Sequence, residues 1–552
     1  MNRIFFNGNI VTMESADGAE LQKASAMWVC DGRYAAVGSL EEVRALSAGR
    51  SEADGRIEEV DLRGATVLPA FTDSHMHVLS LGMYLRDINL TDATSIAQAI
   101  EISRRYIEER QVPAGQWIRS RGWNHDHFTD EARFLNRYDL DKISTVHPLA
   151  FTRTCGHIIS VNSKALELMG MSESCCQVEG GQIDVDENGR PLGIFREAAR
   201  KLVLDAIPEE TEESLRELIR LSAEHALSHG ITEIHTDDFK DVPNNFQKVI
   251  HTYMRLKEEG NLKLRIYEQC NLPSVEKLQS FLDCGYHTGW GDSRFKLGPF
   301  KVLQDGSLGA RTALMRKPYA DDPSTCGIQV FTQEELDAMV ELAQKHGMQI
   351  AIHAIGDGAI ESVQNSIERA QKLYPREDER HGIIHCQITD PAMIARFARM
   401  HLIAYIQPIF LNYDLHIVEN RIGSELAATS YAWKSYIENN VVTAGGSDCP
   451  VESLNIMENI YAAVVRKDLC GFPADGWHPE QALSVAQAVR CFTLNPAYAS
   501  FSEGEKGSIK QGKIADFVLL DQDIFSIEPE EIRKVNILAT YMDGIQVYEK
   551  TK

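Results

Sequence analysis

The sequence predicts an α/β protein built on a (β/α)8 barrel, and three observations lead to this prediction. Eight short apolar runs follow one another between residues 67 and 448, and most are followed by a polar loop. Helical segments such as residues 332–347 come between them, with apolar positions at three- and four-residue spacing. Because parallel strands need helical crossovers, eight buried strands alternating with helices favour a closed barrel.

The eight predicted strands are unevenly spaced along the chain. They lie at residues 67–77, 230–238, 262–270, 295–307, 348–357, 382–387, 402–408 and 441–448. A barrel unit of one strand and one helix averages about 30 residues, whereas roughly 150 separate the first strand from the second. We therefore expect a large insertion after the first strand, at about residues 90–225, that forms a lid or substrate subdomain over the mouth of the barrel.

Both chain ends have a different pattern from the middle. Short alternating runs broken by Asn-Gly and Asp-Gly are typical of hairpins, and no helix is expected in the N-terminal stretch. We expect residues 1–66 and 501–552 to form the two parts of one composite β-sandwich, with the barrel at residues 67–500. The exposed edges of such a sheet would allow a homodimer.

Composition excludes several classes of protein. The chain has 552 residues, 43% of them hydrophobic, and a net charge of −24 that would repel nucleic acids and anionic membrane surfaces. Its 11 cysteines contain no CxxC pair, which is typical of reduced thiols rather than a disulfide framework. No apolar run is long enough for a membrane span or a secretory signal. We expect a cytoplasmic protein with a small-molecule substrate and no nucleic-acid or membrane partner.

Metal-ligand residue types stand at the ends of several predicted strands. His75 and His77 are two apart, so both point to one side of a strand, although this pair alone fits two core histidines equally well. His353, His385 and Asp448 also end predicted strands. Because the carboxyl ends of barrel strands converge, these five side chains should meet. Imidazoles with a carboxylate suit zinc or a similar divalent ion.

A lysine lies in the predicted fourth strand. The ammonium group of Lys301 would be repelled by divalent ions and penalised by burial. The amine would therefore have to be neutral, absent from the site or modified. Carbon dioxide could convert it into an anionic, carboxylate-like carbamate bridge, or Lys301 could extend its charge to solvent or pair with Asp305.

The ordered set His-x-His, Lys, His, His, Asp resembles the amidohydrolase superfamily. The phrases PAFTDSHMH, RGW, GHIISVNSKAL, KVLQDGSLGARTALM, AIHAIGDGA, IIHCQ, GGSDCPV and GKIADFVLLD are similar to the amidohydrolase family 3 branch. This branch comprises YtcJ-like proteins and includes N-substituted formamide deformylases. The resemblance covers nearly the whole chain and implies a metal-dependent hydrolase barrel joined to a composite β-sandwich.

The resemblance also implies a ligand set and a mechanism. One metal would be held by His75, His77 and Asp448, the other by His353 and His385, with Lys301 as an N6-carboxylated bridge. Two zinc ions per chain are expected, with manganese, iron and cobalt as alternatives. A metal-activated hydroxide would attack a non-peptide carbon-nitrogen bond, in an amide or an N-formyl compound, and Asp448 would be the catalytic proton carrier.

Substrate contacts and the exact reaction remain open at the level of sequence. Four residues in family motifs are candidate substrate contacts, although packing explains them equally well: His157, Asn162, Arg311 and Trp123. The same scaffold could hydrolyse an ester, a lactone or a cyclic imide, or deaminate a ring. A third interpretation is a non-catalytic, metal-binding regulatory protein.

Overall fold

A computed structural model describes residues 2–15, 20–48 and 57–551; predictions that fall on residues 1, 16–19, 49–56 and 552 lie outside the described residues. The chain divides into two compact units. The core unit contains Met1–Ser80 and Ser222–Lys552, and the inserted unit contains Leu81–Leu221. Each unit has its own sheets and apolar clusters, so each is described separately.

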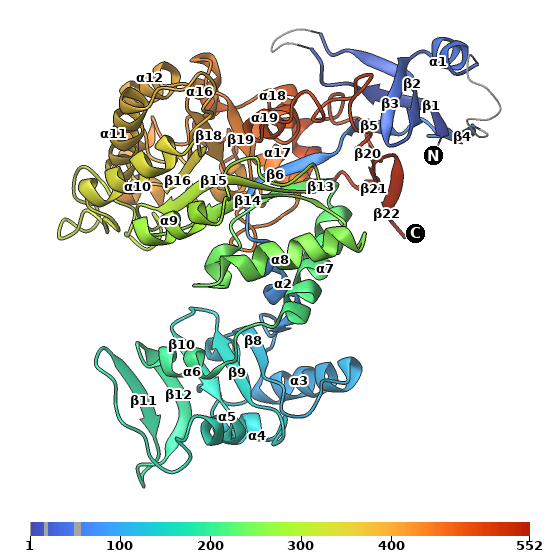
Figure 1. Cartoon of the computed structure of the whole chain (residues 1–552). Coiled ribbons are helices and arrows are strands. Elements are labelled where there is room, and N and C mark those ends of the chain that lie inside the picture. Colours follow the sequence, from blue (N-terminus) through green and yellow to red (C-terminus); the bar gives the residue numbers. More distant parts are fainter. Residues whose placement is uncertain (1, 16–19, 49–56, 552) are drawn as a thin grey trace. The chain divides into compact units, whose positions relative to one another are not determined.

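An eight-stranded parallel sheet forms the centre of the core unit (Figure 1). Its strands are β6 (Phe71–Met76), β13 (Ile231–Thr236), β14 (Arg265–Asn271), β15 (Phe295–Leu303), β16 (Ile350–Ala354), β17 (Gly382–His385), β18 (Ile403–Ile406) and β19 (Thr443–Gly445). Neighbours in space are neighbours in sequence order, and nearly every residue of these strands is buried. Burial on both faces explains why the strands are continuous apolar runs. The prediction of eight parallel barrel strands is confirmed.

The segment that follows β19 is hydrogen-bonded to the end of β6, so the barrel is nearly closed. The backbone N–H of Asp448 donates to the carbonyl of His75 at 2.8 Å, and that of His77 donates to Cys449 at 2.9 Å. The buried carboxylate of Asp73 on β6 accepts hydrogen bonds from the backbone N–H and the hydroxyl of Ser447 at 3.1 and 2.5 Å. These bonds fix the carboxyl ends of β6 and β19 side by side.

Amphipathic helices connect the barrel strands. They include α8 (Phe246–Glu258), α9 (Val275–Asp283), α10 (Gln333–Lys345), α11 (Asp357–Leu373), α12 (Pro391–Arg399), α16 (Trp433–Glu438) and α17 (Ile456–Val465). Helix α10 begins with a capping box between Thr332 and Glu335, and its buried residues recur at three- and four-residue spacing. The helix predicted at residues 332–347 is therefore present.

The two chain ends share one eight-stranded sheet (Figure 1). Its order is β22 (Ile545–Glu549), β21 (Ile537–Met542), β20 (Phe517–Leu520), β5 (Thr66–Pro69), β1 (Asn2–Val11), β2 (Lys23–Cys30) and β3 (Arg33–Gly38), with β4 (Glu58–Asp61) also paired to β1. The antiparallel pair β5 and β20 joins the N-terminal to the C-terminal strands. Adjacent residues of β1 and β2 enter two different apolar clusters, so both faces of the sheet are covered.

The expectation of no helix in the N-terminal stretch is wrong. Helix α1 (Leu40–Ser47) packs its buried Val43 into one of these apolar clusters. It begins at Ser39, whose hydroxyl accepts from the backbone N–H of Glu42, while the Glu42 carboxylate accepts from that of Ser39. This capping box is a sequence signal for a helix start.

The inserted unit contains a six-stranded mixed sheet. In order its strands are β11 (Gly181–Val185), β12 (Pro191–Glu197), β10 (Ile158–Val161), β9 (Leu149–Arg153), β8 (Ile118–Trp123) and β7 (Ile88–Asn89). Helix α3 (Ile96–Arg110) packs into an apolar cluster that includes Trp123 and Phe151. The unit therefore has a core of its own.

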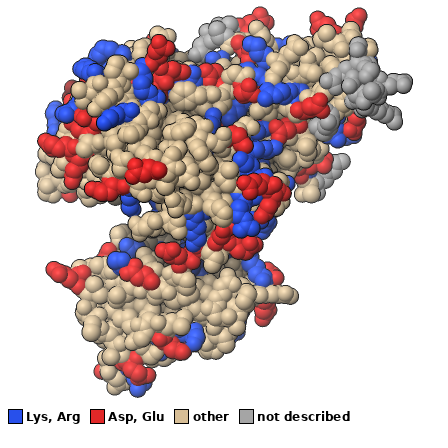
Figure 2. Space-filling model, in the orientation of Figure 1, with Lys and Arg blue, Asp and Glu red and all other residues tan. Residues whose placement is uncertain are grey.

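The surface carries charges of both signs. Acidic and basic side chains are interspersed over the face of the molecule shown in Figure 2. None of the described helices combines the length and the apolar composition that crossing a membrane requires.

A buried arginine fastens the barrel to the terminal sheet. Arg265 on β14 is paired with Asp516 at 2.8 Å and Asp543 at 2.6 Å, and its side chain is 3% exposed. Arg265→Met should lower the free energy of unfolding by about 3 to 5 kcal/mol, because it leaves a buried carboxylate without its partner. Urea denaturation measures this loss. Arg44→Met, which breaks the exposed pair with Glu59, should change little; equal effects would contradict the assignment.

Stability should fall in mild acid because of a buried histidine. His381 accepts from the N–H of Ile350 through Nδ1 and contacts Gln344 Oε1 through Nε2, and burial lowers its pKa to about 3. The unfolded chain, with a pKa near 6.5, binds the proton first, so this contribution is lost as pH falls from 6.5 towards 3. The expected loss is about 2 kcal/mol between pH 6.5 and 5. Urea titrations at both values should show a smaller difference in His381→Gln than in the native protein.

Candidate metal centre

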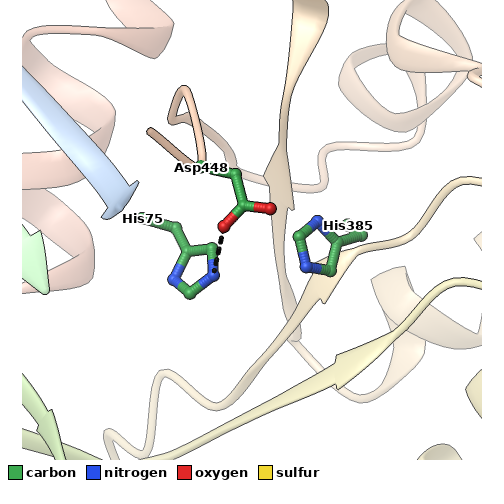
Figure 3. A group of neighbouring side chains, drawn as sticks. All are labelled: His75, His385 and Asp448. Carbon is green, nitrogen blue, oxygen red and sulfur yellow. Dashed lines mark ion pairs between the residues drawn. The ribbon is translucent and has the colours of Figure 1, made fainter. Parts of the chain in front are cut away.

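The structure brings three of the predicted ligands together at the carboxyl ends of the barrel strands. His75 on β6, His385 on β17 and Asp448 after β19 each offer a ligand atom, and these atoms lie within 4.8 Å of one another. Figure 3 shows the Asp448 carboxylate between the two imidazole rings. This is the one group of three or more histidine, cysteine or acidic ligands found in the described part of the chain.

Hydrogen bonding fixes the tautomer of His75. Gln269 on β14 donates its Nε2 to the carbonyl of Ser74 at 3.1 Å, so its Oε1 faces His75 Nδ1 at 2.7 Å. His75 Nδ1 must therefore carry the proton. Burial, with a further contribution from Lys301, lowers the pKa of His75 to about 4, so at pH 7 the ring is neutral and Nε2 has a free lone pair.

That lone pair faces an anionic oxygen. His75 Nε2 lies 3.3 Å from Asp448 Oδ1, and two acceptors repel each other unless a cation lies beside them. Burial alone would raise the pKa of Asp448, but the contact with His77, whose Nε2 can donate to Oδ1 at 2.9 Å, outweighs it and holds that pKa well below its ordinary value. The carboxylate is therefore ionised. A neutral nitrogen and an ionised oxygen converging in a buried site are the donors that a divalent metal requires.

His385 has the same kind of support. Its Nδ1 lies 2.8 Å from Gln407 Oε1, and Phe410 stacks on its ring with the centroids 5.7 Å apart. Burial, followed by the neighbouring His353, lowers the pKa of His385 well below its ordinary value. The second ring nitrogen of His385 is thus also a lone-pair donor. An outer residue that orients a histidine in this way is typical of metal sites.

The other three predicted ligands lie around this group. His77 Nε2 is 2.9 Å from Asp448 Oδ1, and its buried Nδ1 has no hydrogen-bond partner among the described residues. The ring centroids of His353 and His385 are 4.4 Å apart. His353 Nε2 contacts the carbonyl of Gly306 at 3.0 Å. The structure thus brings all four histidines and Asp448 into one contiguous cluster.

Lys301 is buried beside the cluster. Its side chain on β15 is 1% exposed, and its charge lowers the pKa values of both His75 and His385. Burial lowers the pKa of Lys301 to about 8, against opposing contributions from Asp237 and Asp448. An ammonium group in this position would compete with a metal ion for Asp448. An uncharged amine or an anionic derivative would not.

Two of the ligand residues have an unusual backbone conformation. The φ angles of His385 and Asp448 are +81° and +58°, in the left-handed region that costs energy for residues with a side chain. The bond from the Asp448 amide to the His75 carbonyl, and one from the Cys386 amide to Ala354, hold these conformations. The backbone conformation therefore directs both side chains towards the cluster.

Sequence reasoning missed the residues that orient the ligands. Gln269, Gln407 and Asp73 are all buried, and each forms a hydrogen bond with the side chain or the backbone of a ligand or its neighbour. The one signal for them is a polar residue near the end of an otherwise apolar strand, as in IYEQC and LIAYIQP.

Three of the predicted substrate contacts lie in the inserted unit. Trp123 is fully buried, and its Nε1 donates to the carbonyl of Phe151 at 3.1 Å. Asn162 is also fully buried, and its side chain caps helix α5 (Ser163–Leu168). His157 is exposed and pairs with Glu197 at 2.9 Å. Packing and capping account for the first two positions, and a substrate role for all three stays a prediction.

The fourth predicted contact, Arg311, lies in the core unit after β15. It forms two hydrogen bonds with Asp321, at 3.1 and 2.9 Å, and about a third of its side chain is exposed. This places its charge in an ion pair outside the histidine cluster. Its role towards a substrate also stays a prediction.

Comparison with known sequences and structures adds independent findings. Residues 58–548 match the sequence profile of the Amidohydrolase family. The chain is 32% identical to YtcJ of Bacillus subtilis (strain 168), with both chains covered completely. It is 26% identical to an N-substituted formamide deformylase of Arthrobacter pascens, over 99% of this chain and 98% of that protein.

A solved structure shares the architecture. The crystal structure of an uncharacterized metal-dependent hydrolase from Pyrococcus furiosus superposes with a TM-score of 0.78 at 26% identity. The match covers 95% of this chain and all of the other. Core unit and inserted unit are therefore both represented in a single known chain.

Removing the partner of a ligand should weaken metal binding without removing a ligand. Gln407→Leu is expected to lower divalent-metal affinity about 10- to 100-fold, because His385 loses the contact that fixes its ring. Competition with a chelator, followed by elemental analysis, measures the affinity. Gln344→Leu is the matched control, since Gln344 contacts His381 at the same 2.8 Å outside the cluster. Equal affinities in the two variants would contradict the assigned role.

Proposed function

Because the chain belongs to the amidohydrolase family, we propose that it is a metal-dependent hydrolase that cleaves a non-peptide carbon-nitrogen bond. The observation that carries this proposal is the buried convergence of His75, His385 and Asp448. Two neutral imidazoles and an ionised carboxylate whose ligand atoms converge suit a divalent ion such as zinc. An amide or an N-formyl compound is the proposed substrate class.

The similarity to a named enzyme supports this substrate class. The deformylase of Arthrobacter pascens acts, by its name, on N-substituted formamides, and it matches this chain over almost its full length. Such substrates have a carbonyl to be attacked and a nitrogen that must be protonated as it leaves. Both requirements match what the residues of the cluster can supply.

The proposed ligand set contains six side chains: His75, His77, Lys301, His353, His385 and Asp448. When bound, divalent ions lower the pKa of a coordinated water to about 7 and polarise the substrate carbonyl. Lys301 would act as its carbamate, which requires an unprotonated amine, and the lowering of its pKa to about 8 by burial favours that form. The carbamate would be an anionic ligand where the ammonium would have been repelled.

Asp448 has the proposed role of carrying the proton. Its carboxylate would accept the proton of the attacking water and deliver it to the nitrogen as the carbon-nitrogen bond breaks. The contact with His77 that keeps it ionised also fixes its orientation. Because the cluster is almost completely buried, little bulk water competes for these contacts.

The same proposal extends to the organisation of the chain. Residues 67–500 would be the catalytic barrel with its insertion at about 90–225, and residues 1–66 and 501–552 the two parts of a β domain. His157, Asn162, Arg311 and Trp123 are proposed substrate contacts. We propose a cytoplasmic enzyme with a small-molecule substrate, able to form a homodimer.

Removal of metal and of the proton carrier should both abolish turnover. A panel of N-alkyl and N-aryl formamides, amides, esters and lactones should contain a substrate whose hydrolysis stops on chelation and resumes when zinc, manganese or cobalt is returned. Asp448→Asn should lower kcat/KM about 10²- to 10⁴-fold, because the leaving nitrogen loses its proton donor.

Matched controls separate this role from folding. Asp468→Asn, which alters a buried carboxylate bonded to His416 and to loop amides, should leave kcat/KM nearly unchanged. Elemental analysis of Asp448→Asn shows how much of its effect comes from metal loss. Turnover that resists chelation would contradict the metal mechanism, and turnover of esters alone would contradict the carbon-nitrogen assignment.

A further inference from the structure

A second buried cation lies away from the metal centre. Arg466 stands at the end of helix α17 and is fully buried. Its Nε donates to the carbonyl of Trp477 at 3.0 Å and its Nη1 to that of Tyr431 at 2.9 Å. In the described part of the chain, no ion pair links Arg466 to a carboxylate, although Glu480 acts on it from farther away. Burial lowers the pKa of Arg466 to about 9, which leaves it charged at pH 7.

Two hydrogen-bond donors in this region have no acceptor. Arg466 Nη2 is buried and unpartnered among the described residues, and so is the indole Nε1 of Trp477, a residue that is 8% exposed. The two side chains are in contact. The guanidinium carbon lies 5.2 Å from the centre of the Trp477 ring and 4.5 Å from that of Trp433. Two buried donors without an acceptor among the described residues therefore lie on side chains that pack against each other.

The positive charge of Arg466 determines which kind of acceptor fits these donors. A buried charge without a counterion is costly, and contacts with aromatic faces and neutral carbonyls offset only part of that cost. A water molecule would satisfy the donors but would leave the positive charge uncompensated. We propose that Arg466 and Trp477 form a binding site for a small inorganic anion of the halide class, such as chloride.

Burial limits the size of the anion. Tyr431 and Trp433, which pack against the guanidinium, are 1% and 2% exposed, so no large organic anion could reach Nη2 without unpacking them. The proposed anion would be a single atom that accepts from both donors, which lie on side chains packed against each other. The anion therefore stabilises the junction between α17, the segment around Tyr431 and the loop that ends at Trp477.

This site is distinct from the metal centre but belongs to the same unit. The Tyr431 amide donates to the carbonyl of Gln387 at 2.8 Å, two residues beyond His385. No metal ligand contacts Arg466 in the described structure. The proposed anion site is therefore independent of the proposed hydrolase activity, and its test needs no substrate.

The test compares anions at equal ionic strength. Thermal unfolding of the full chain is followed in sodium chloride, sodium bromide and sodium gluconate, where gluconate is too large for the site. We expect the Tm to rise and saturate with chloride and bromide but not with gluconate. Anomalous scattering from crystals grown in bromide should place a peak within hydrogen-bond distance of Arg466 Nη2.

Two variants separate a bound anion from general salt effects. Trp477→Phe removes the Nε1 donor but keeps a ring, and it should raise the apparent Kd for chloride by about fivefold, the effect of one lost hydrogen bond. Trp433→Phe also perturbs the packing on the guanidinium, yet it keeps both orphaned donors. It should lower the Tm while leaving the chloride dependence as in the native protein.

The outcomes decide the proposal in either direction. Saturation by halides that weakens in Trp477→Phe and persists in Trp433→Phe supports the anion site. Identical Tm curves in chloride and gluconate, equal halide responses in the two variants, or water density without a bromide peak beside Nη2 would each overturn it. Because both variants are compared by their response to anions, a loss of overall stability does not obscure the result.

Discussion

The hydrogen bond from the Asp448 amide to the His75 carbonyl is the contact on which the candidate site depends. It joins the last barrel strand to the first, across an interval of more than 370 residues that includes the whole inserted unit. Without this seam, the ends of β6 and β19 would separate, and the carboxylate would lie away from His75 on β6 and from His77 just beyond it. Asp73 reinforces the seam by binding Ser447. The same hydrogen bonds therefore join the ends of the barrel sheet and bring the ligand side chains together.

The sequence predicts the barrel well because its strands are buried on both faces. That burial requires continuous apolar runs such as MQIAIH and GIIH, which are recognisable without knowledge of their neighbours. Helix α1 was missed although Ser39 and Glu42 form a capping box, because short alternating strands flank it on both sides. The order of the six strands in the inserted unit could not be predicted. It depends on pairings such as β10 with β12, which local pattern does not determine.

In the candidate site, too, local sequence pattern predicts some features and long-range pairing determines the others. Ligand residue types at strand ends are visible in the sequence, since the barrel topology alone brings them together. The outer partners are not. Gln269 reaches His75 only because β14 and β6 flank β13, and Gln407 reaches His385 because β17 and β18 pair in one register. A shift of two residues in either strand would move the glutamine away while leaving the apolar pattern unchanged. Register across strands, which sequence does not fix, determines the tautomers of the ligands.

Burial has opposite effects on the two kinds of ligand, and the combination suits a cation. Desolvation makes His75 and His385 neutral, so each has a lone pair, whereas the hydrogen bond from His77 keeps Asp448 ionised in spite of desolvation. The lone pair of His75 facing the ionised Asp448 is costly unless a cation lies beside both. A divalent ion at this position would remove this cost. Metal binding would therefore offset the free-energy cost of arranging the cluster. We expect the barrel to be more stable with a bound metal than without one.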